Sequence, residues 1–405
     1  MYLNISPSNI IFILAYAFDL KWEYLEKEIS EIDLQESSFF ELLVFVLVMW
    51  TNKLRRQGLF RSFLGMEDEI QRIRGKILFT PSMKSNGLSG NTLCCQFDEL
   101  SFDILENQIL LSTLEFCEKE LVKRGKIVKV DKRKKDINNL ALSIYNLVRL
   151  LSSQVSYCPL SIQLFNQLIF HRMNIAYKPI LKICRFIYDS AVLAQEGDEK
   201  FFDIPEDRMS EIFERFLRNY LTENLEGERI KVDSPQPRNW VVSADELETK
   251  VNHIPSIHPD IVITQKGNPK LVIDAKFYTK AMNKNKWWSR GEVVGEEKEE
   301  RESFKTHSSN LYQIIAYTNY YNCNGLLVYA QTESGSFEEM VKIKPEHYSD
   351  KKACYRKFGF QTFDLSGDFE GFKTRLDDFV KQISELASIS ISESRGTLSI
   401  GKNAT

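Results

Sequence analysis

The chain has 405 residues, of which 43% are hydrophobic and 27% are charged, a composition that is typical of globular proteins and excludes a largely disordered one. A chain of this length is expected to form two domains. Its net charge of −3 excludes a protein that attracts nucleic acid through a strongly basic overall surface. Any contact with DNA therefore has to come from local basic patches.

Cysteine content and apolar runs indicate the compartment. The seven cysteines include no C-x-x-C pair, which favours a reducing compartment and argues against a zinc site. An apolar run at 10–18 meets charged residues too soon for a membrane span, and the run at 42–50 is about half as long as a bilayer requires. We therefore expect a cytoplasmic protein without membrane contact, and a buried helix at 42–50.

Residues 1–195 are predicted to form a mixed, mainly helical domain. Apolar residues three and four positions apart predict helices at 105–121 and 137–151. Short strands are predicted at 58–60, 75–79 and 126–130, with 65–71 connecting the first two.

Two basic stretches of this domain are candidate contacts for DNA or for a protein partner. An ordinary solvated helix face or loop also carries such runs, and this alternative stays open. The candidate residues are Arg55, Arg56, Arg74, Lys76, Lys123, Arg124, Lys132 and Arg133.

An acidic, polar stretch at 195–199 marks the expected start of a second domain, 196–390. Pro205 and the acidic residues after it predict the start of a helix that continues through an apolar stripe at 209–221. The later elements are a hairpin of strands 261–264 and 271–278, a charged connection at 283–305, a helix at 310–321, a strand at 325–329, a closing helix at 369–389, and a disordered tail at 391–405. The fold class expected from this order is α+β or α/β.

The hairpin carries the residues with the clearest chemistry. Asp274 and Lys276 are two apart on one strand, so they project from the same face. If the hairpin is symmetric about its Gly-Asn turn, Asp274 lies opposite Ile261 and beside Asp260. Two neighbouring carboxylates among apolar residues repel each other unless a cation lies between them.

Magnesium is the cation that this pair predicts, because Mg²⁺ prefers carboxylate and water oxygens and can bridge to a phosphate. Such a site can activate water and stabilise the charge that develops in phosphodiester hydrolysis, with Lys276 positioning the water. Taken singly, Asp260 also fits a turn residue after Pro259, and Asp274 with Lys276 fits a surface ion pair.

Taken together, Pro259-Asp260 and Asp274-x-Lys276 match the PD-(D/E)-x-K signature and predict a restriction-endonuclease-like domain. Gln313 and Tyr317 share a face of the following helix, in a spacing that resembles RecB-type nucleases, and are expected to support the site. Glu214, on the helix before the hairpin, is a candidate metal ligand. The alternatives are an amphipathic helix that happens to contain Gln and Tyr for Gln313 and Tyr317, and a solvent-facing residue for Glu214.

Segments spread from residue 8 to about 330 resemble the McrC family, in the order in which that family has them. They are 8–17, 73–77, 97–107, 209–216, 260–263, 274–276 and 309–317. The resemblance implies the nuclease subunit of a McrBC-type restriction system that depends on 5-methylcytosine modification. It also implies that the first domain engages a McrB-type AAA+ ring, and that the chain cleaves double-stranded DNA when that ring hydrolyses GTP.

The sequence has no G-x-x-x-x-G-K-[ST] phosphate loop, so GTP is expected to be used by the partner and Mg²⁺ by this chain. Two other functions remain: a stand-alone or recombination-type RecB-like nuclease, and a non-catalytic adaptor that stimulates the motor's GTPase. The complete set of Asp260, Asp274 and Lys276 favours an active enzyme.

Overall fold

The chain forms two compact units, Met1–Glu31 together with Pro205–Thr405, and Ile32–Ile204. This computed structural model describes residues 5–29, 37–85, 91–196, 206–225, 229–238, 256–277, 283–286, 302–305, 308–331, 338–343 and 356–389. The predicted boundary at 195–199 lies close to the observed one. The predicted first domain is wrong at its start, because the first 31 residues group with the C-terminal unit.

The first helix, α1 (Pro7–Ala17), explains this correction. Its side chains are buried over most of its length, so the helix needs apolar neighbours on nearly all sides. The Asn9 amide donates to the carbonyl oxygen of Leu365 at 3.0 Å. The Phe12 ring lies 6.2 Å from that of Phe216 and 5.8 Å from that of Phe372. A segment from the start of the chain thus completes the core of the C-terminal unit.

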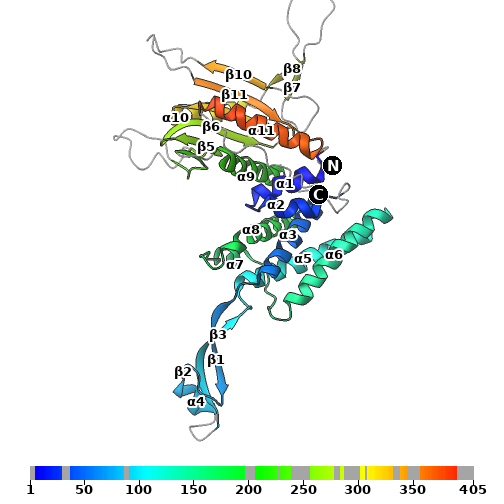
Figure 1. Cartoon of the computed structure of the whole chain (residues 1–405), viewed down its shortest axis with the longest axis vertical. Helices are drawn as coiled ribbons and strands as arrows, with labels where there is room; N and C mark the ends of the chain where they lie inside the picture. Colours follow the sequence, from blue (N-terminus) through cyan, green and yellow to red (C-terminus); the bar gives the residue numbers. More distant parts are fainter. Residues whose placement is uncertain are drawn as a thin grey trace, which may run out of the picture. The chain divides into compact units, whose positions relative to one another are not determined.

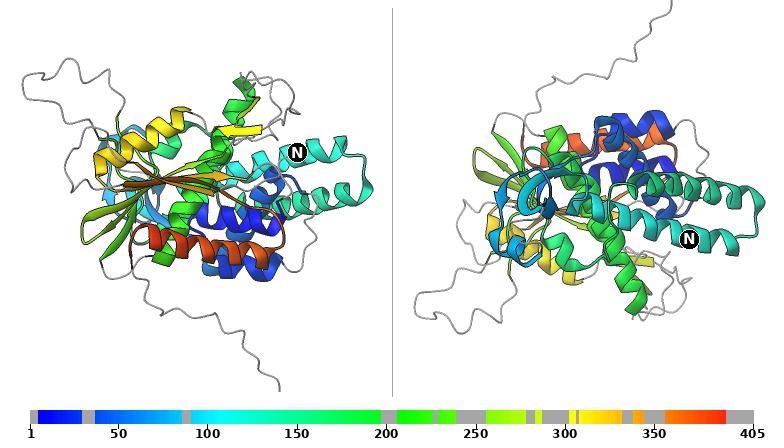
Figure 2. Two further views of the ribbon diagram at one scale, coloured as in Figure 1. Left: turned by 90° about the horizontal axis from the view of Figure 1, so that it is seen from above. Right: turned by 90° about the horizontal axis from the view of Figure 1, so that it is seen from below.

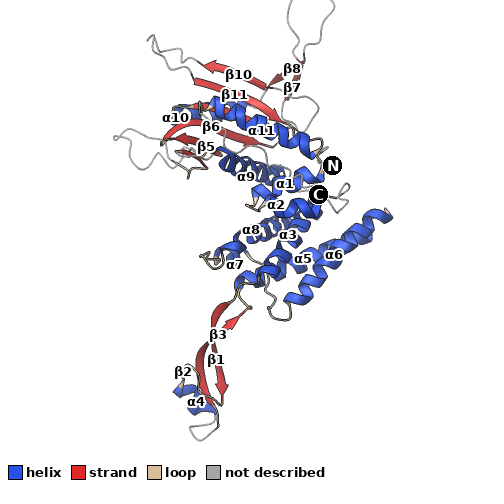
Figure 3. Cartoon of the chain, viewed as in Figure 1, coloured by secondary structure: helices blue, strands red, loops and turns tan. Residues whose placement is uncertain are grey.

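A six-stranded sheet forms the centre of the C-terminal unit (Figures 1 and 3). In spatial order the strands are β10 (Glu338–Ile343), β11 (Arg356–Phe363), β9 (Asn324–Ala330), β6 (Asn268–Lys276), β5 (Ile261–Gln265) and β4 (Ile230–Asp233). β9 runs parallel to both β6 and β11, and the other pairs are antiparallel. The predicted hairpin and the strand at 325–329 are present, whereas β4, β10 and β11 were not predicted.

Helices cover both faces of this sheet. The helix α10 (Ser308–Tyr321) lies on one face, and α1 and α11 (Phe369–Leu386) lie on the other, as the edge-on view of Figure 2 shows. The helix α9 (Glu206–Leu225) packs with α1 and α11, where the rings of Phe216 and Phe372 are stacked. Val272 of β6 is buried against Ile314 and Tyr317 of α10. The short α2 (Trp22–Ile29) follows α1.

Three further predictions fall wholly or partly outside the described residues. The connection at 283–305 contains a two-stranded sheet of β7 (Asn283–Lys286) and β8 (Glu302–Lys305). Residues 287–301 lie outside the described residues, as do 197–205 at the domain boundary and the tail 391–405.

The other unit is mainly helical, as predicted. Its helices are α3 (Phe39–Gln57), α5 (Leu105–Ile127), α6 (Asp131–Leu151), α7 (Ile162–Asn166), η1 (Ile175–Tyr177) and α8 (Lys178–Glu196). The buried helix predicted at 42–50 is part of α3. The strand predicted at 126–130 is wrong, because those residues end α5 and connect it to α6. None of the described helices is long and apolar enough to span a bilayer.

A small sheet of β1 (Ser62–Ile70), β3 (Leu93–Ser101) and β2 (Lys76–Ile77) carries the short helix α4 (Phe79–Ser85). The predicted strand at 58–60 is irregular, and the predicted connection at 65–71 lies almost wholly within β1. The strand β1 is exposed over most of its length, so its sequence is rich in charged and polar residues. This composition is also typical of a loop, which is why the segment was predicted as a connection.

Candidate active site

The β5–β6 hairpin brings Asp260 and Asp274 together. Ile261 pairs with Ile273, so the predicted pairing of Ile261 with Asp274 is wrong by one residue. The turn is centred on Lys266 and Gly267, one residue before the predicted centre, because Gln265 pairs with Asn268. A register shift between Ile263 and Thr264 then offsets part of this difference, and a symmetric count across the turn cannot include it. One step beyond the last pair, Asp260 comes level with Asp274.

Hydrogen bonding and charge hold three side chains at this end of the hairpin. The Asp260 carboxylate accepts a hydrogen bond of 2.8 Å from the backbone N–H of Ala275. The Lys276 ammonium lies 2.9 Å from Oδ2 of Asp274. Asp274 is fully buried, and apart from Lys276 its oxygens have no hydrogen-bond donor among the described residues. Its close partner is therefore the lysine charge.

The two carboxyls are electrostatically unfavourable as they stand. Burial raises the pKa of Asp274; the neighbouring Asp260 raises it further, and Lys276 partly offsets both effects. Burial also raises the pKa of Asp260, which Lys276 lowers and the charge of Glu214 raises. One ammonium does not balance a buried carboxylate and a half-buried one beside it. The donor set thus fits a hard cation such as Mg²⁺.

Glu214 on α9 lies near the pair but has a partner of its own. Its Oε1 is 3.2 Å from Nη1 of Arg218. Burial raises the pKa of Glu214, while Arg218 and Arg215 lower it. No three acidic, histidine or cysteine side chains converge on a metal-sized space anywhere in the described ranges. The structure thus brings Asp260 and Asp274 together as a pair. Glu214 is close enough for its charge to raise the pKa of Asp260.

Gln313 and Tyr317 of α10 form a hydrogen-bonded chain that ends on the segment before Asp260. The Gln313 amide donates to the Tyr317 hydroxyl at 2.8 Å, and this hydroxyl donates to the carbonyl oxygen of His258 at 3.0 Å. The Tyr317 side chain is buried, and the charges of Asp274 and Asp260 add to the effect of burial in raising its pKa. Both predicted supporting residues therefore lie at the site.

Sequence reasoning missed three groups at this site. The backbone N–H of Ala275 and the carbonyl of His258 carry no sequence signal, because their roles depend on the strand register and on the approach of α10. Arg218 had a readable signal: it follows Glu214 by four residues, the spacing at which oppositely charged side chains meet on a helix.

Three of the basic candidates are engaged within their own unit. Arg124 Nε lies 3.0 Å and Arg133 Nη2 3.9 Å from Oε1 of the buried Glu41. Lys123 pairs with Glu120 on the same helix at 2.5 Å. The two arginines thus neutralise an internal carboxylate.

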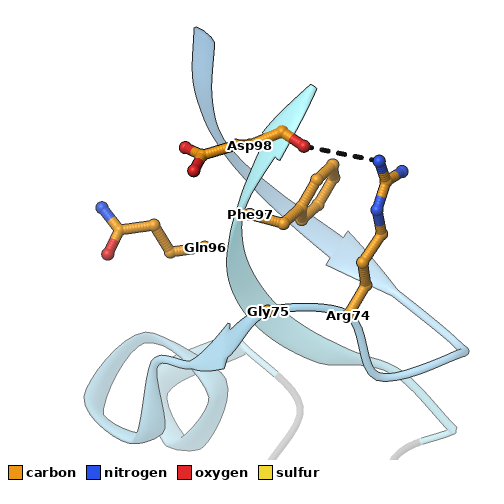
Figure 4. A pocket seen from close by; sticks show the side chains of 5 residues that line it. All are labelled: Arg74, Gly75, Gln96, Phe97 and Asp98. Atoms are coloured by element: carbon orange, nitrogen blue, oxygen red, sulfur yellow. Dashed lines mark hydrogen bonds between the residues drawn. The ribbon is translucent and has the colours of Figure 1, made fainter. Parts of the chain in front are cut away.

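The remaining basic candidates lie at separate places on the same unit. Arg55 and Arg56 are in the last turn of α3, and Lys132 is exposed near the start of α6. Figure 4 shows Arg74 beside a recess of about 410 Å³ in the small sheet, lined by Arg74, Gly75, Gln96, Phe97 and Asp98. Arg74 donates to the carbonyl oxygen of Asp98 at 3.4 Å and lies over the Phe97 ring. Lys76 is exposed on β2.

Comparison with known proteins places the chain in a family. Residues 8–330 match the family of McrBC 5-methylcytosine restriction system components. The chain is 26% identical over 338 residues to the type IV methyl-directed restriction enzyme EcoKMcrBC of Escherichia coli strain K12. The aligned region covers 80% of this chain and 86% of that protein.

Two solved structures are also similar. One is a half-complex from a tetradecameric assembly of Thermococcus gammatolerans McrB AAA+ hexamers with bound McrC; it is 15% identical and covers 93% of this chain and 76% of that one, with a TM-score of 0.48. The other is the Thermococcus gammatolerans McrBC complex, 17% identical over 55% of this chain and 60% of that one, with a TM-score of 0.36. On the family match over most of its length, the chain belongs to the McrBC 5-methylcytosine restriction system components, as the resemblance to McrC predicts.

Proposed function

We propose that this chain is the DNA-cleaving subunit of its restriction system, a magnesium-dependent endonuclease with a PD-(D/E)-x-K site at Asp260, Asp274 and Lys276. One observation carries the proposal: Asp274 is fully buried next to a second carboxylate, and the Lys276 ammonium at 2.9 Å is the one cation against which the structure pairs it within the described residues. A carboxylate retained in such a place is costly unless a cation or a reaction requires it.

Asp260 and Asp274 are the residues that would hold Mg²⁺, and Glu214 is a further carboxylate whose charge acts on Asp260. When bound, the ion would supply Lewis acidity toward the scissile phosphate and a more acidic water. Lys276 keeps an ammonium 2.9 Å from Asp274. From there it can orient a water molecule or offset negative charge that develops on the phosphate.

Tyr317 acts as a positioning residue for Asp260 in this proposal. Its hydroxyl holds the carbonyl of His258, two residues before Asp260, and Gln313 orients that hydroxyl. The neighbouring Ile257 is joined to Arg238 by a pair of backbone hydrogen bonds of 2.7 and 2.9 Å. The segment that leads into Asp260 is thus fixed from two sides, which favours a reproducible carboxylate position.

The partner in this proposal is a McrB-type AAA+ ring that hydrolyses GTP on modified double-stranded DNA. Membership of the McrBC family and the lack of a phosphate loop in the sequence support it. The chain would then supply the nuclease site, and its cleavage would depend on the ring.

The decisive experiment is cleavage of methylated duplex DNA by the complex with its McrB-type partner, GTP and Mg²⁺. Asp274→Ala is expected to abolish cleavage while GTP hydrolysis by the partner continues. Asp233→Ala is the matched control, because Asp233 is a more exposed aspartate of the same sheet that pairs with Lys231. Cleavage by Asp274→Ala at the rate of the unaltered complex would refute the assignment. Cleavage by the purified chain without partner and GTP would instead indicate a stand-alone nuclease.

A further inference from the structure

The antiparallel helices α5 and α6 end together in a lysine-rich turn. They lie side by side in the turquoise part of Figure 1 and are joined by residues 128–130. Four exposed lysines lie in or beside this turn, and none of them has a carboxylate partner among the described residues: Lys126, Lys129, Lys134 and Lys135. They and residues 128–130 are called the lysine tip below.

The arginines of the same segment differ from these lysines, because they do have a carboxylate partner. Arg124 and Arg133 turn toward Glu41, with 15% and 29% of their side chains exposed. The lysine tip instead faces solvent, so the chain separates its basic residues into an internal, neutralised set and an external set. Lysine suits contact with phosphates because its ammonium is a compact charge on a flexible stem.

At the start of α6 the arrangement is unfavourable for the isolated protein. Lys134 lies in the first turn of α6 and Lys135 directly follows that turn, where the helix dipole is positive and favours anions over cations. Lys126 and Lys129 bring like charge from the end of α5 and from the connection. A polyanion would relieve both the mutual repulsion and the conflict with the dipole.

We propose that the lysine tip binds the phosphate backbone of duplex DNA without regard to base sequence. The inference rests on the proposed nuclease function, which requires a duplex to be held by a chain whose net charge of −3 does not attract it. Contacts of this kind would hold DNA while leaving the choice of site to the partner.

The test is equilibrium binding of the full chain to a fluorescent duplex in EDTA, measured by anisotropy across a salt series. The tip variant replaces all four lysines by Gln. We expect it to bind roughly tenfold more weakly, with a salt slope smaller by about 0.9 for each phosphate that the variant no longer neutralises. The matched control replaces four exposed lysines elsewhere by Gln and should bind as the unaltered chain does: Lys21, Lys231, Lys357 and Lys381.

Two results would overturn the inference: equal affinity and salt slope for the tip variant and the unaltered chain, or no binding by the unaltered chain at low salt. The thermal midpoint of the tip variant should change little, because the loss of Lys134 favours the positive end of α6 whereas the loss of Lys126 removes a favourable cation from the last turn of α5. A lower midpoint together with weaker binding would count against the inference, since misfolding would then explain the weaker binding.

A second variant separates DNA from a protein partner. Ile127 and Val130 are exposed beside the lysines, at 72% and 57%, and apolar side chains contribute little to contact with phosphates. Replacing both by Ser should leave duplex binding unchanged. If this variant and the tip variant both lose the partner ring while keeping DNA, the tip is a protein interface and the proposal is wrong. EDTA prevents cleavage, so this assay measures DNA binding alone. A failure to bind would refute the proposal for the lysine tip, and the loss of cleavage in Asp274→Ala would still support the nuclease proposal.

Discussion

Each unit of the molecule buries a carboxylate, and the two differ in what surrounds it. Glu41 is 5% exposed and has Arg124 at 3.0 Å, Arg133 at 3.9 Å and the backbone N–H of Ser38 as partners. Asp274 is fully buried with a second carboxylate beside it and one lysine. At Glu41 the chain supplies enough positive charge to compensate the buried carboxylate. At Asp274 the compensation by Lys276 is incomplete, as the proposed binding of an external cation requires.

Neutralising Asp274 gives the largest expected effect on activity. Asp274→Asn keeps the shape and removes the charge that would bind a metal, so cleavage should fall by at least about 10³-fold. Stability should not fall, because a costly buried charge is removed. A thermal midpoint that is unchanged or raised by about 2 °C would agree. A clear drop in the midpoint would mean that Asp274 stabilises the fold as Glu41 does.

The same chemical change at Glu41 should have the opposite outcome. Glu41→Gln leaves Arg124 and Arg133 without their anion in a partly buried place, which should cost about 3 kcal/mol or more of unfolding free energy. Urea unfolding followed by hydrogen exchange in α3, α5 and α6 measures this change. Cleavage per folded molecule should be unchanged. The comparison fails if Glu41→Gln is as stable as the unaltered chain.

Removing the Tyr317 hydroxyl tests whether the segment before Asp260 must be held. Tyr317→Phe keeps the buried ring but removes the hydrogen bond to His258, and we expect roughly tenfold slower cleavage and a decrease of about 1 kcal/mol in stability. The Mg²⁺ concentration for half-maximal cleavage should also rise, which a purely structural role would not cause. Tyr312→Phe, an exposed tyrosine of the same helix, is the control. An unchanged Mg²⁺ dependence would remove Tyr317 from the site.

The contrast between the two carboxylates also shows how far sequence reasoning extends. The hairpin, α10 and the trio Asp260, Asp274 and Lys276 follow from local patterns, because turn chemistry and side-chain alternation act within a few residues. The partner of Asp274 was missed by one residue, because the turn is centred on Lys266 and Gly267 and not on Gly267 and Asn268, and the register shift at Ile263 offsets only part of that difference.

Contacts between residues far apart in the chain could not be predicted from the sequence. Nothing in the apolar run at 10–18 tells that α1 packs against α9 and α11, some 200 and 360 residues away. The ion pairs of Arg124 and Arg133 with Glu41 also join distant parts of the sequence, and without them a run of basic residues looks like a single binding patch. Only the structure separates the internal arginines from the exposed lysines.

Glu214 lies between the two cases and gives the smallest expected effect. Like Glu41 it has an arginine partner, Arg218 at 3.2 Å, and like Asp274 it adds charge to the hairpin site, where it raises the pKa of Asp260. Glu214→Gln should therefore slow cleavage only several-fold and change stability by less than about 1 kcal/mol.

Glu211→Gln is the matched control for Glu214, because Glu211 lies on the same helix, is 30% exposed against 27%, and pairs with Arg208 and Arg215. It should affect stability similarly and leave cleavage unchanged. If Glu214→Gln abolishes cleavage as Asp274→Asn does, Glu214 is a full metal ligand that leaves Arg218 when the ion binds. If both glutamate variants cleave at the normal rate, the site consists of Asp260 and Asp274 alone, and Glu214 belongs with Glu41 among the structural carboxylates.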